Sequence, residues 1–503
     1  MKGIVHLVGA GPGAVGLLTL RGAELLRRAD VVVSDMLVNP RLLDLAPPGA
    51  ERISRGNAGS GGLSQQEINE LLIARARDGK RVVRLKGGDP YVFGRGAEEA
   101  EALAAAKIPF EVVPGVSSIT AVPNYAGIPL THRACCSSFT VLTGNEDPEK
   151  GELAVDFQAL AKVPGTRVIL MGLRRLEEIT SKLLAAGAAP ETPAAVIQQG
   201  TLGRQVTVEG TLATIAGLAA EKKLAPPALT VIGDVLKFRP RLDWFEHLPL
   251  FGRRIVVTRA RAQAGPLCSR FAELGAEVLE IPSIRTEPTD RKEEIIDALL
   301  ELNAYDWLVF TSANGVDAFF GYYFKRFQDL RDLGGARIAA VGPATAARLQ
   351  ALHLQIDLMP KEALGVKIAA EFQKFESIEN LKICLLRAQD ANPDLPRALE
   401  ALGGIVDDIA VYKTVAEAPE ETGAAAELRE RGADWITFTS GSTVKHFHDR
   451  FDLPGLVRKF PGLKLASIGP ETSQALEALG LKPALEAKQH TGDGLVEALL
   501  KAT

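Results

Sequence analysis

The stretch that decides the fold of the N-terminal half is Arg84-Leu85-Lys86-Gly87-Gly88-Asp89-Pro90-Tyr91-Val92-Phe93-Gly94-Arg95-Gly96. Together with Val82 and Val83 before it, the apolar part predicts a buried strand that leads into a glycine-aspartate-proline turn and a glycine-arginine loop. Glycine lets a ligand approach the backbone, aspartate is a fixed acceptor, and arginine offers paired donors. The stretch therefore predicts a ligand site, with Asp89 and Arg95 among its polar groups.

Two further segments have the same character. They are Val8-Gly9-Ala10-Gly11-Pro12-Gly13, and Val113-Pro114-Gly115-Val116-Ser117-Ser118 followed by residues 126–133. Short apolar runs alternate with amphipathic stretches at 18–28, 65–78, 97–106 and 175–186, which predicts an α/β fold. Pro114-Gly115 is the expected hinge between two lobes.

The three glycine motifs, in this order, resemble the uroporphyrinogen-III C-methyltransferases, which are two-lobed tetrapyrrole methylases. The resemblance runs from about Gly3 to Trp244 and implies S-adenosylmethionine as methyl donor. It assigns Asp35 as proton acceptor. Our other candidates are Arg95 for catalysis and Glu98 and Arg133 for substrate binding, because the substrate carries eight carboxylates and the arginine fork suits a carboxylate. The residues that the resemblance assigns to the donor are Pro12, Gly87, Gly88, Asp89, Val92, Ser117, Ser118, Met171 and Gly200.

Each assignment has a simpler structural interpretation. Ser117 and Ser118 could cap the following helix, Met171 alone would more often be core, and charged residues such as Glu98 could form surface ion pairs. The sequence also departs from the family at three positions. Ala14 stands where an aspartate is usual, Met36 where an arginine is usual, and Asn57 where the family has a lysine assigned as proton donor.

A nicotinamide-dependent enzyme is a competing class, because residues 9–14 formally fit the pattern G-x-G-x-x-A and Asp30 or Asp35 lies about twenty residues later. Pro12 argues against it, since proline lacks the backbone N–H that a pyrophosphate would need. The segments around Gly87 and Arg133 would also have no role in such an enzyme. We therefore favour the methyltransferase.

The C-terminal half contains an internal repeat of about 128 residues. Residues 255–259 match 383–387, 274–276 match 402–404, 306–312 match 434–440, and 341–343 match 468–470 with a shift of one. Such a duplication predicts two similar α/β lobes, between which ligands commonly bind. Arg259 and Arg387 are equivalent in the repeat, and each could meet a substrate carboxylate or pair with an acidic side chain.

This half, from about Phe251 to Leu500, resembles uroporphyrinogen-III synthase. The residues that carry the resemblance are 310–316, 412–414, 438–444, 468–472 and 491–495. In that family the lobes are discontinuous, which implies one lobe from 251–285 plus 415–503 and the other from 286–414. The N-terminal half would comprise residues 1–245, with lobes of about 1–114 and 115–245.

For the synthase, the resemblance turns Tyr412 toward the substrate, where its hydroxyl could assist loss of the hydroxyl group from hydroxymethylbilane. Two strand-to-helix junctions, Thr311-Ser312 and Thr439-Ser440, would present helix N-termini to a polycarboxylate, or would simply be N-caps. No metal is expected, because the histidines are scattered and His446 and His448 would point to different faces of one helix.

The composition sets limits on partners and location. The net charge of −4 gives no bulk attraction for nucleic acid, and no stretch of eighteen apolar residues suggests a membrane span. Only four cysteines and no signal-peptide pattern predict a cytoplasmic protein. The methyltransferase resemblance suggests a homodimer.

The sequence therefore predicts a bifunctional enzyme of tetrapyrrole biosynthesis. The synthase would convert hydroxymethylbilane to uroporphyrinogen III with inversion of ring D, and the methyltransferase would methylate that product twice to precorrin-2, toward cobalamin or sirohaem. The alternative is a synthase fused to an impaired methylase-like binding domain, which Ala14 and Asn57 would explain.

Overall fold

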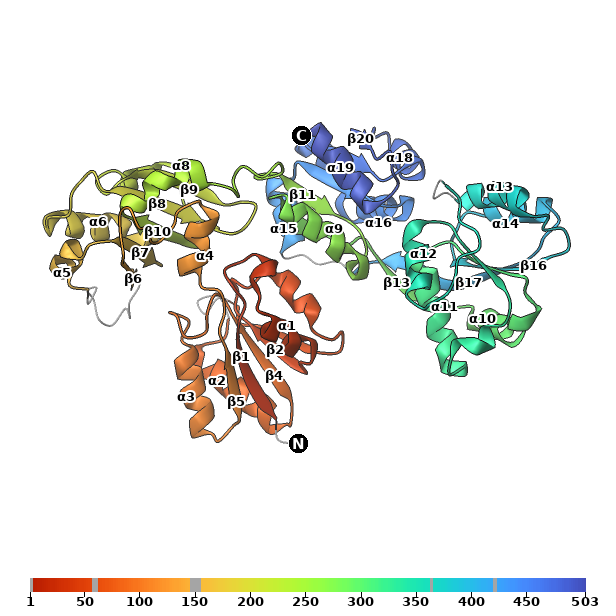
Figure 1. The fold of residues 1–503 in the computed structure, drawn as a ribbon, viewed down its shortest axis with the longest axis horizontal. Helices are drawn as coiled ribbons and strands as arrows, with labels where there is room; N and C mark the ends of the chain where they lie inside the picture. Colours follow the sequence, from red (N-terminus) through yellow and green to blue (C-terminus); the bar gives the residue numbers. More distant parts are fainter. Residues whose placement is uncertain (1–2, 57–61, 145–154, 362–364, 419–422) are drawn as a thin grey trace. The chain divides into compact units, whose positions relative to one another are not determined.

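The computed structural model describes residues 1–503 except 1–2, 57–61, 145–154, 362–364 and 419–422. The chain forms two compact units. One comprises Met1–Arg254 with Phe271–Glu277, and the other comprises Ile255–Arg270 with Val278–Thr503. Each unit contains two five-stranded sheets with helices packed against them, so the prediction of an α/β fold with two lobes in each half is confirmed (Figure 1).

The first sheet has the order β3-β2-β4-β1-β5, and its strands are all parallel. Its strands are β1 (Ile4–Gly9), β2 (Val31–Ser34), β3 (Glu51–Ser54), β4 (Arg81–Lys86) and β5 (Phe110–Val113). Its helices are α1 (Leu20–Arg27), α2 (Gln65–Arg77) and α3 (Gly96–Ala105). A parallel sheet needs cover on both faces. Side chains of α1 pack on one face, and side chains of α2 and α3 pack on the other.

Local sequence explains where these helices begin. Ser64 caps α2 through a reciprocal capping box with Glu67. The Ser64 hydroxyl accepts a hydrogen bond from the Glu67 N–H at 3.2 Å, and the Glu67 carboxylate accepts one from the Ser64 N–H at 2.7 Å. Thr19 accepts from the Gly22 N–H at the start of α1. The predicted helices at 18–28, 65–78, 97–106 and 175–186 are confirmed within two residues at each end.

The second sheet has the order β6-β7-β10-β8-β9 and is mixed, with only the β6–β7 pair parallel. Its strands are β6 (Phe139–Thr143), β7 (Thr166–Leu170), β8 (Pro193–Gln198), β9 (Val206–Thr211) and β10 (Ala228–Ile232). The helices of this lobe are α4 (Ser118–Tyr125), α5 (Phe157–Lys162), α6 (Leu176–Ala185), α7 (Ile215–Glu221) and α8 (Arg239–Leu242).

The second unit is built from two sheets of related design, β12-β11-β18-β19-β20 and β13-β17-β16-β14-β15. The first has the strands β11 (Arg254–Val257), β12 (Glu277–Glu280), β18 (Trp435–Phe438), β19 (Lys464–Ser467) and β20 (Leu485–Glu486). The second has the strands β13 (Ile284–Pro288), β14 (Trp307–Phe310), β15 (Arg337–Ala340), β16 (Lys382–Ala388) and β17 (Ile405–Ala416).

Helices follow the strands in both lobes of this unit. The lobe of the first sheet contains the helices α9 (Arg261–Glu273), α15 (Ala424–Arg431), α16 (Gly441–Phe451), α17 (Leu453–Lys459), α18 (Pro470–Glu477) and α19 (Gly492–Ala502). The lobe of the second sheet contains the helices α10 (Lys292–Leu300), α11 (Ala313–Arg326), α12 (Pro343–Gln350), α13 (Gly365–Phe375) and α14 (Asp394–Ala401).

The internal repeat is visible in the sheets. Four strands of each sheet are related by the repeat: β12 corresponds to β17, β11 to β16, β18 to β14 and β19 to β15. The corresponding strands stand in the same order, β12-β11-β18-β19 in one sheet and β17-β16-β14-β15 in the other. The matched glycines Gly275 and Gly403 both have left-handed backbone, with φ of 91° and 86°. The duplication inferred from sequence is therefore a duplication of fold.

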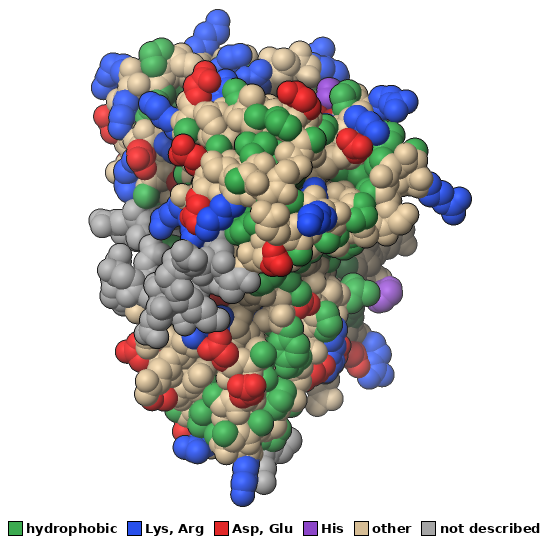
Figure 2. Space-filling model, turned by 90° about the vertical axis from the view of Figure 1, so that its left-hand side faces the viewer, with side chains coloured by type: hydrophobic (Ala, Val, Ile, Leu, Met, Phe, Trp, Pro, Cys, Tyr) green, Lys and Arg blue, Asp and Glu red, His purple; other side chains and the backbone are tan. Residues whose placement is uncertain are grey.

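The surface carries both signs of charge. On the face shown in Figure 2, Lys and Arg side chains are interspersed with Asp and Glu side chains among apolar ones. In the described part of the chain, no helix is both long enough and apolar enough to cross a membrane.

Candidate active sites

The three glycine turns found in the sequence meet in the structure. Each follows the carboxyl end of a strand of the parallel sheet, the edge where α/β proteins bind ligands. Gly88 N–H donates to the Gly11 carbonyl at 2.8 Å, and Gly11 N–H donates to the Gly88 carbonyl at 3.2 Å. A Cβ on Gly115 would lie 2.1 Å from the Gly88 carbonyl oxygen, and one on Gly9 would lie 2.4 Å from the Gly115 Cα. Only glycine permits this backbone-on-backbone packing.

The Gly87–Asp89 turn leaves its own backbone accessible. The strand before it and Pro90 after it are buried, whereas the turn is partly exposed. A Cβ on Gly87 would find only the Leu37 Cβ within 4 Å, at 3.8 Å. The Asp89 carboxylate accepts from the Gly115 N–H at 3.0 Å and the Tyr91 N–H at 2.8 Å. Asp89 thus holds two of the turns together beside an open stretch of glycine backbone, a suitable surface for a donor such as S-adenosylmethionine.

The other residues assigned to the donor lie in several places. Pro12 belongs to the first turn. Ala14 stands two residues later, where the family has aspartate, and its N–H donates to the Thr201 hydroxyl at 3.1 Å. Thr201 follows Gly200, which is buried. The Ser117 hydroxyl caps α4 and Ser118 begins that helix, so the capping role is confirmed. Val92 packs against the core of the second lobe.

Met171 differs from the simpler expectation of a core methionine. It follows β7, its side chain is 46% exposed, and its backbone is left-handed with φ of 54°. An exposed apolar side chain in a strained backbone conformation is a feature often found at functional sites.

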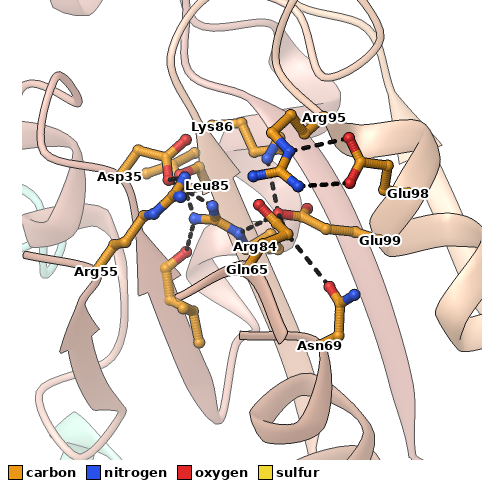
Figure 3. A network of polar contacts seen from close by, with 11 residues as sticks. Asp35, Arg55, Gln65, Asn69, Arg84, Leu85, Lys86, Arg95, Glu98 and Glu99 are labelled. Carbon is orange, nitrogen blue, oxygen red and sulfur yellow. Dashed lines mark hydrogen bonds and ion pairs between the residues drawn. The ribbon is translucent and has the colours of Figure 1, made fainter. Parts of the chain in front are cut away.

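Asp35 lies at the end of β2, on the same edge of the sheet (Figure 3). Its carboxylate accepts a short hydrogen bond from the guanidinium of Arg84, which is fully buried, and it lies 3.8 Å from the Arg55 guanidinium. Arg84 Nε also donates to Glu99 Oε1 at 3.1 Å, and Lys86 Nζ donates to the same oxygen at 2.8 Å. Asp35 is therefore held from the interior of the lobe by a chain of buried charges.

The electrostatics of this network are tightly balanced. The side chains of Arg84, Lys86 and Glu99 are all inaccessible to solvent. Burial lowers the pKa of Lys86 and the neighbouring Arg84 lowers it further, while Glu99 opposes both effects. The second carboxylate oxygen of Glu99 is buried without a hydrogen-bond partner. Two buried cations thus share the Glu99 carboxylate, and Arg84 also pairs with Asp35.

Arg84, Lys86 and Glu99 were not predicted from the sequence as members of the site. A signal was present, because two cations at i and i+2 lie on one face of an otherwise apolar strand. Charges in such a strand are rarely buried unless they are paired. Their partner Glu99, one turn into α3, could not be identified without the packing of α3 against the sheet.

Arg95 and Glu98, assigned to catalysis and substrate binding, pair with each other. Arg95 Nε donates to Glu98 Oε1 at 2.9 Å and Arg95 Nη2 donates to Glu98 Oε2 at 2.7 Å, with both side chains about half exposed. The Arg95 guanidinium holds the pKa of Glu98 below its ordinary value. Arg133 is exposed, and it has no ion-pair partner within the described residues. Asn57 and Ala58 lie outside the described residues, and Met36 is 52% exposed.

In the second unit, Tyr412 lies in β17 opposite Pro288 of β13. Its ring is buried, and its hydroxyl is 3.1 Å from the Ser312 hydroxyl. Burial raises the pKa of Tyr412, so the phenol remains protonated at neutral pH and can donate a hydrogen bond. The side chain of Asn314 also interacts with the hydroxyl, and it accepts a hydrogen bond from Gln263 in α9.

The two strand-to-helix junctions have the expected caps. The Ser312 hydroxyl accepts from the Gly315 N–H at 3.0 Å at the start of α11. The Ser440 hydroxyl accepts from the Thr443 N–H at 3.3 Å at the start of α16. Thr311 and Thr439 precede these caps and are partly exposed. The capping role is thus observed, and ligand binding by these N-termini remains a prediction.

Comparisons with known proteins identify both halves. Residues 5–216 match the family described as "Tetrapyrrole (Corrin/Porphyrin) Methylases", and residues 266–497 match "Uroporphyrinogen-III synthase HemD". A relative from Ruminiclostridium josui, "Porphyrin biosynthesis protein HemD", is 37% identical over 99% of this chain and 98% of its own length.

Two further relatives concern the methylase. The "Uroporphyrinogen-III C-methyltransferase" of Bacillus subtilis is 40% identical over 75% of this chain and 78% of its own length. The "S-adenosyl-L-methionine-dependent uroporphyrinogen III methyltransferase" of Methanosarcina barkeri is 54% identical over 46% of this chain and 92% of its own length. The chain therefore belongs to the tetrapyrrole methylase family in its N-terminal half and to the uroporphyrinogen-III synthase family in its C-terminal half, and it is a fusion of the two.

Proposed function

We propose that the C-terminal half cyclises hydroxymethylbilane to uroporphyrinogen III with inversion of ring D, and that the N-terminal half methylates this product twice to precorrin-2. The observation that supports the methylase most directly is the meeting of three glycine turns beside Asp35 on one edge of a parallel sheet. The match of one chain to both families, with a relative aligned over nearly its full length, supports the pairing of the two reactions.

For the methylase we assign donor binding to the backbone of Gly87 and Gly88, with Asp89 fixing the turn and Pro12, Val92, Ser117, Ser118, Met171 and Gly200 around it. S-adenosylmethionine, when bound, supplies an electrophilic methyl group on a sulfonium. Asp35, held by Arg84 and Arg55, would accept the proton that the tetrapyrrole releases. Arg95 and Arg133 would bind carboxylates, and Glu98 would keep Arg95 oriented. Positioning is then the main contribution of the protein.

For the synthase we assign Tyr412 as the hydrogen-bond donor to the departing hydroxyl group of hydroxymethylbilane. Ser312, 3.1 Å from the phenol, orients it. The N-termini of α11 and α16 at Thr311-Ser312 and Thr439-Ser440 would bind substrate carboxylates through their N–H groups. Loss of the hydroxyl group leaves a resonance-stabilised cation, so fixed dipoles can carry much of the catalysis.

We also propose a cytoplasmic location and a homodimer formed by the methylase half, and we place the boundary between the halves at 245–251. None of the four cysteines, all of which the structure describes, forms a disulfide, as a reducing compartment favours. Light scattering on the purified chain measures the oligomeric state, and expression of 1–245 and 251–503 separately tests the boundary.

The direct test of the function is incubation of the pure protein with hydroxymethylbilane, with and without S-adenosylmethionine. Without the donor we expect uroporphyrinogen III rather than the isomer I that forms spontaneously. With the donor we expect a dimethylated product. Isomer III without any methylation would leave a synthase fused to a binding domain, and isomer I alone would refute the synthase assignment.

Gly87→Val should weaken S-adenosylmethionine binding by about tenfold or more. The added side chain would enter the open space beside the turn without clashing with the protein, since only the Leu37 Cβ lies within 4 Å of the new Cβ. Loss of a close backbone contact typically costs at least one hydrogen bond, about 1 kcal/mol, plus the clash. Isothermal calorimetry measures the affinity. Gly49→Val is the control, because Gly49 is exposed with nothing within 4 Å. Equal donor affinity in both variants would move the donor site elsewhere.

Arg133→Ala should raise the KM for uroporphyrinogen III and leave S-adenosylmethionine affinity unchanged. Loss of one charge-assisted hydrogen bond costs about 1.5–3 kcal/mol, so a rise of about tenfold or more is expected. Methylation rates at limiting substrate measure it. Arg133 is exposed and has no ion-pair partner among the described residues, so the fold should be unaffected. A KM equal to that of the parent would remove Arg133 from the substrate site.

A further inference from the structure

The two arginines related by the internal repeat have different environments. Arg387, at the end of β16, is buried, and both of its outer nitrogens are engaged. Its Nε and Nη2 donate to the two carboxylate oxygens of Asp408, and its Nη1 donates to the Asn392 carbonyl at 2.6 Å. Of the two roles expected for this arginine, the structure shows the pairing with an acidic side chain.

Arg259, its counterpart after β11, has no such partner. Within the described residues no carboxylate forms an ion pair with it, and its only hydrogen bond runs from Nε to the Gln263 side chain at 3.2 Å. The residue that corresponds to Asp408 in the repeat is Glu280. The side chain is nevertheless mostly enclosed, and this burial alone lowers the pKa of Arg259. A buried guanidinium without a counter-charge is destabilising.

Hydrogen bonds connect Arg259 to the assigned synthase site. Gln263, which accepts from Arg259, donates to the Asn314 side chain in α11 of the other lobe. Asn314 in turn interacts with the Tyr412 hydroxyl, 3.1 Å from Ser312. The uncompensated cation is thus linked through two amide side chains to the phenol that we assign to catalysis.

We propose that Arg259 binds a carboxylate side chain of the linear tetrapyrrole and of its cyclised product, next to Tyr412. This inference rests on the proposed synthase function. The guanidinium fork fits an acetate or propionate group bidentately, and a substrate carboxylate supplies the missing counter-charge. One copy of the repeated arginine stabilises the fold, and the other recognises substrate.

The test compares Arg259→Gln, Arg259→Lys and a surface control, Arg348→Gln, in the full chain. Arg348 is about half exposed in α12 and pairs with Asp317, so its loss should change little. The probe is uroporphyrin III, the stable oxidised form of the product, with binding followed by porphyrin fluorescence. We expect Arg259→Gln to weaken binding and raise the KM for hydroxymethylbilane about tenfold or more. Arg259→Lys should recover part of the loss, because it keeps the charge without the fork.

Thermal stability separates binding from a structural role. Arg259→Gln should melt at or above the temperature of the parent, because it removes an uncompensated buried charge, whereas Arg387→Gln should melt lower. If the parent makes isomer III and Arg259→Gln still binds uroporphyrin III as the parent does, this inference is overturned and the proposed synthase function is not. The inference is also overturned if Arg259→Lys melts at a lower temperature than the parent but has the KM of the parent. A parent that makes no isomer III overturns the proposed synthase function itself.

Discussion

Glu99→Gln is expected to lower the free energy of opening of β4 and α3 by about 3–5 kcal/mol. The substitution keeps the size of the side chain but leaves two fully buried cations, Arg84 and Lys86, without their shared carboxylate. Breaking a buried ion pair on one side is far more costly than never having formed it. Hydrogen exchange of amides in residues 81–105 measures the opening free energy in the full chain.

The neighbouring residue provides a matched control. Glu98→Gln removes the partner of Arg95, but both side chains of that pair are about half exposed. An exposed pair contributes about 0–1 kcal/mol, so exchange in residues 81–105 should hardly change. Similar losses in the two variants would show that the buried network does not stabilise this lobe.

The effect of Glu99→Gln should also depend on pH, with a defined sign. Burial and Arg84 already place the folded-state pKa of Lys86 below its value in the unfolded chain. Between these two pKa values the unfolded state binds more protons, so stability rises with pH across that window. Removing Glu99 takes away the stronger of the two carboxylates that raise the pKa of Lys86, the other being Asp35, and extends the window downward. The deficit of the variant should therefore shrink as the pH rises through the lowered folded-state pKa of Lys86.

Tyr412→Phe is expected to slow formation of uroporphyrinogen III by about a hundredfold. The ring and its packing are kept, and the donor 3.1 Å from Ser312 is lost. Burial raises the pKa of Tyr412, so in the parent the phenol should keep its proton throughout the neutral range and activity should not fall there from its loss. The measurement is the rate and the ratio of isomer III to isomer I.

Tyr305→Phe is the appropriate control for this prediction. Tyr305 is also buried in the same lobe, and its hydroxyl donates to Asp407 at 2.7 Å, away from the Ser312 cap. Its loss should lower stability by about 1 kcal/mol or more without changing the isomer ratio. Should Tyr412→Phe behave like Tyr305→Phe, with only isomer III at the parent rate, Tyr412 would be a packing residue.

The sequence alone determined the fold class, the repeat and the set of motifs at the sheet edge. Strand and helix periods are local. Gly9 and Gly115 mark places where no side chain fits, and Gly88 has a left-handed backbone with φ of 66°, so glycines in the sequence already point to these turns. The resemblance to the two families was likewise contained in short ordered motifs, and the comparisons confirm it.

Only the tertiary structure decided which charges compensate each other. In the sequence, Arg84, Lys86 and Glu99 are separate charged residues, and Arg259 and Arg387 are equivalent copies. Packing of α3 against the sheet brings Glu99 to both Arg84 and Lys86. In the second unit Arg387 forms an ion pair with Asp408, whereas no carboxylate among the described residues pairs with Arg259. Pairing and burial are long-range properties, since an ion pair depends on a few ångströms between residues that the local pattern does not relate.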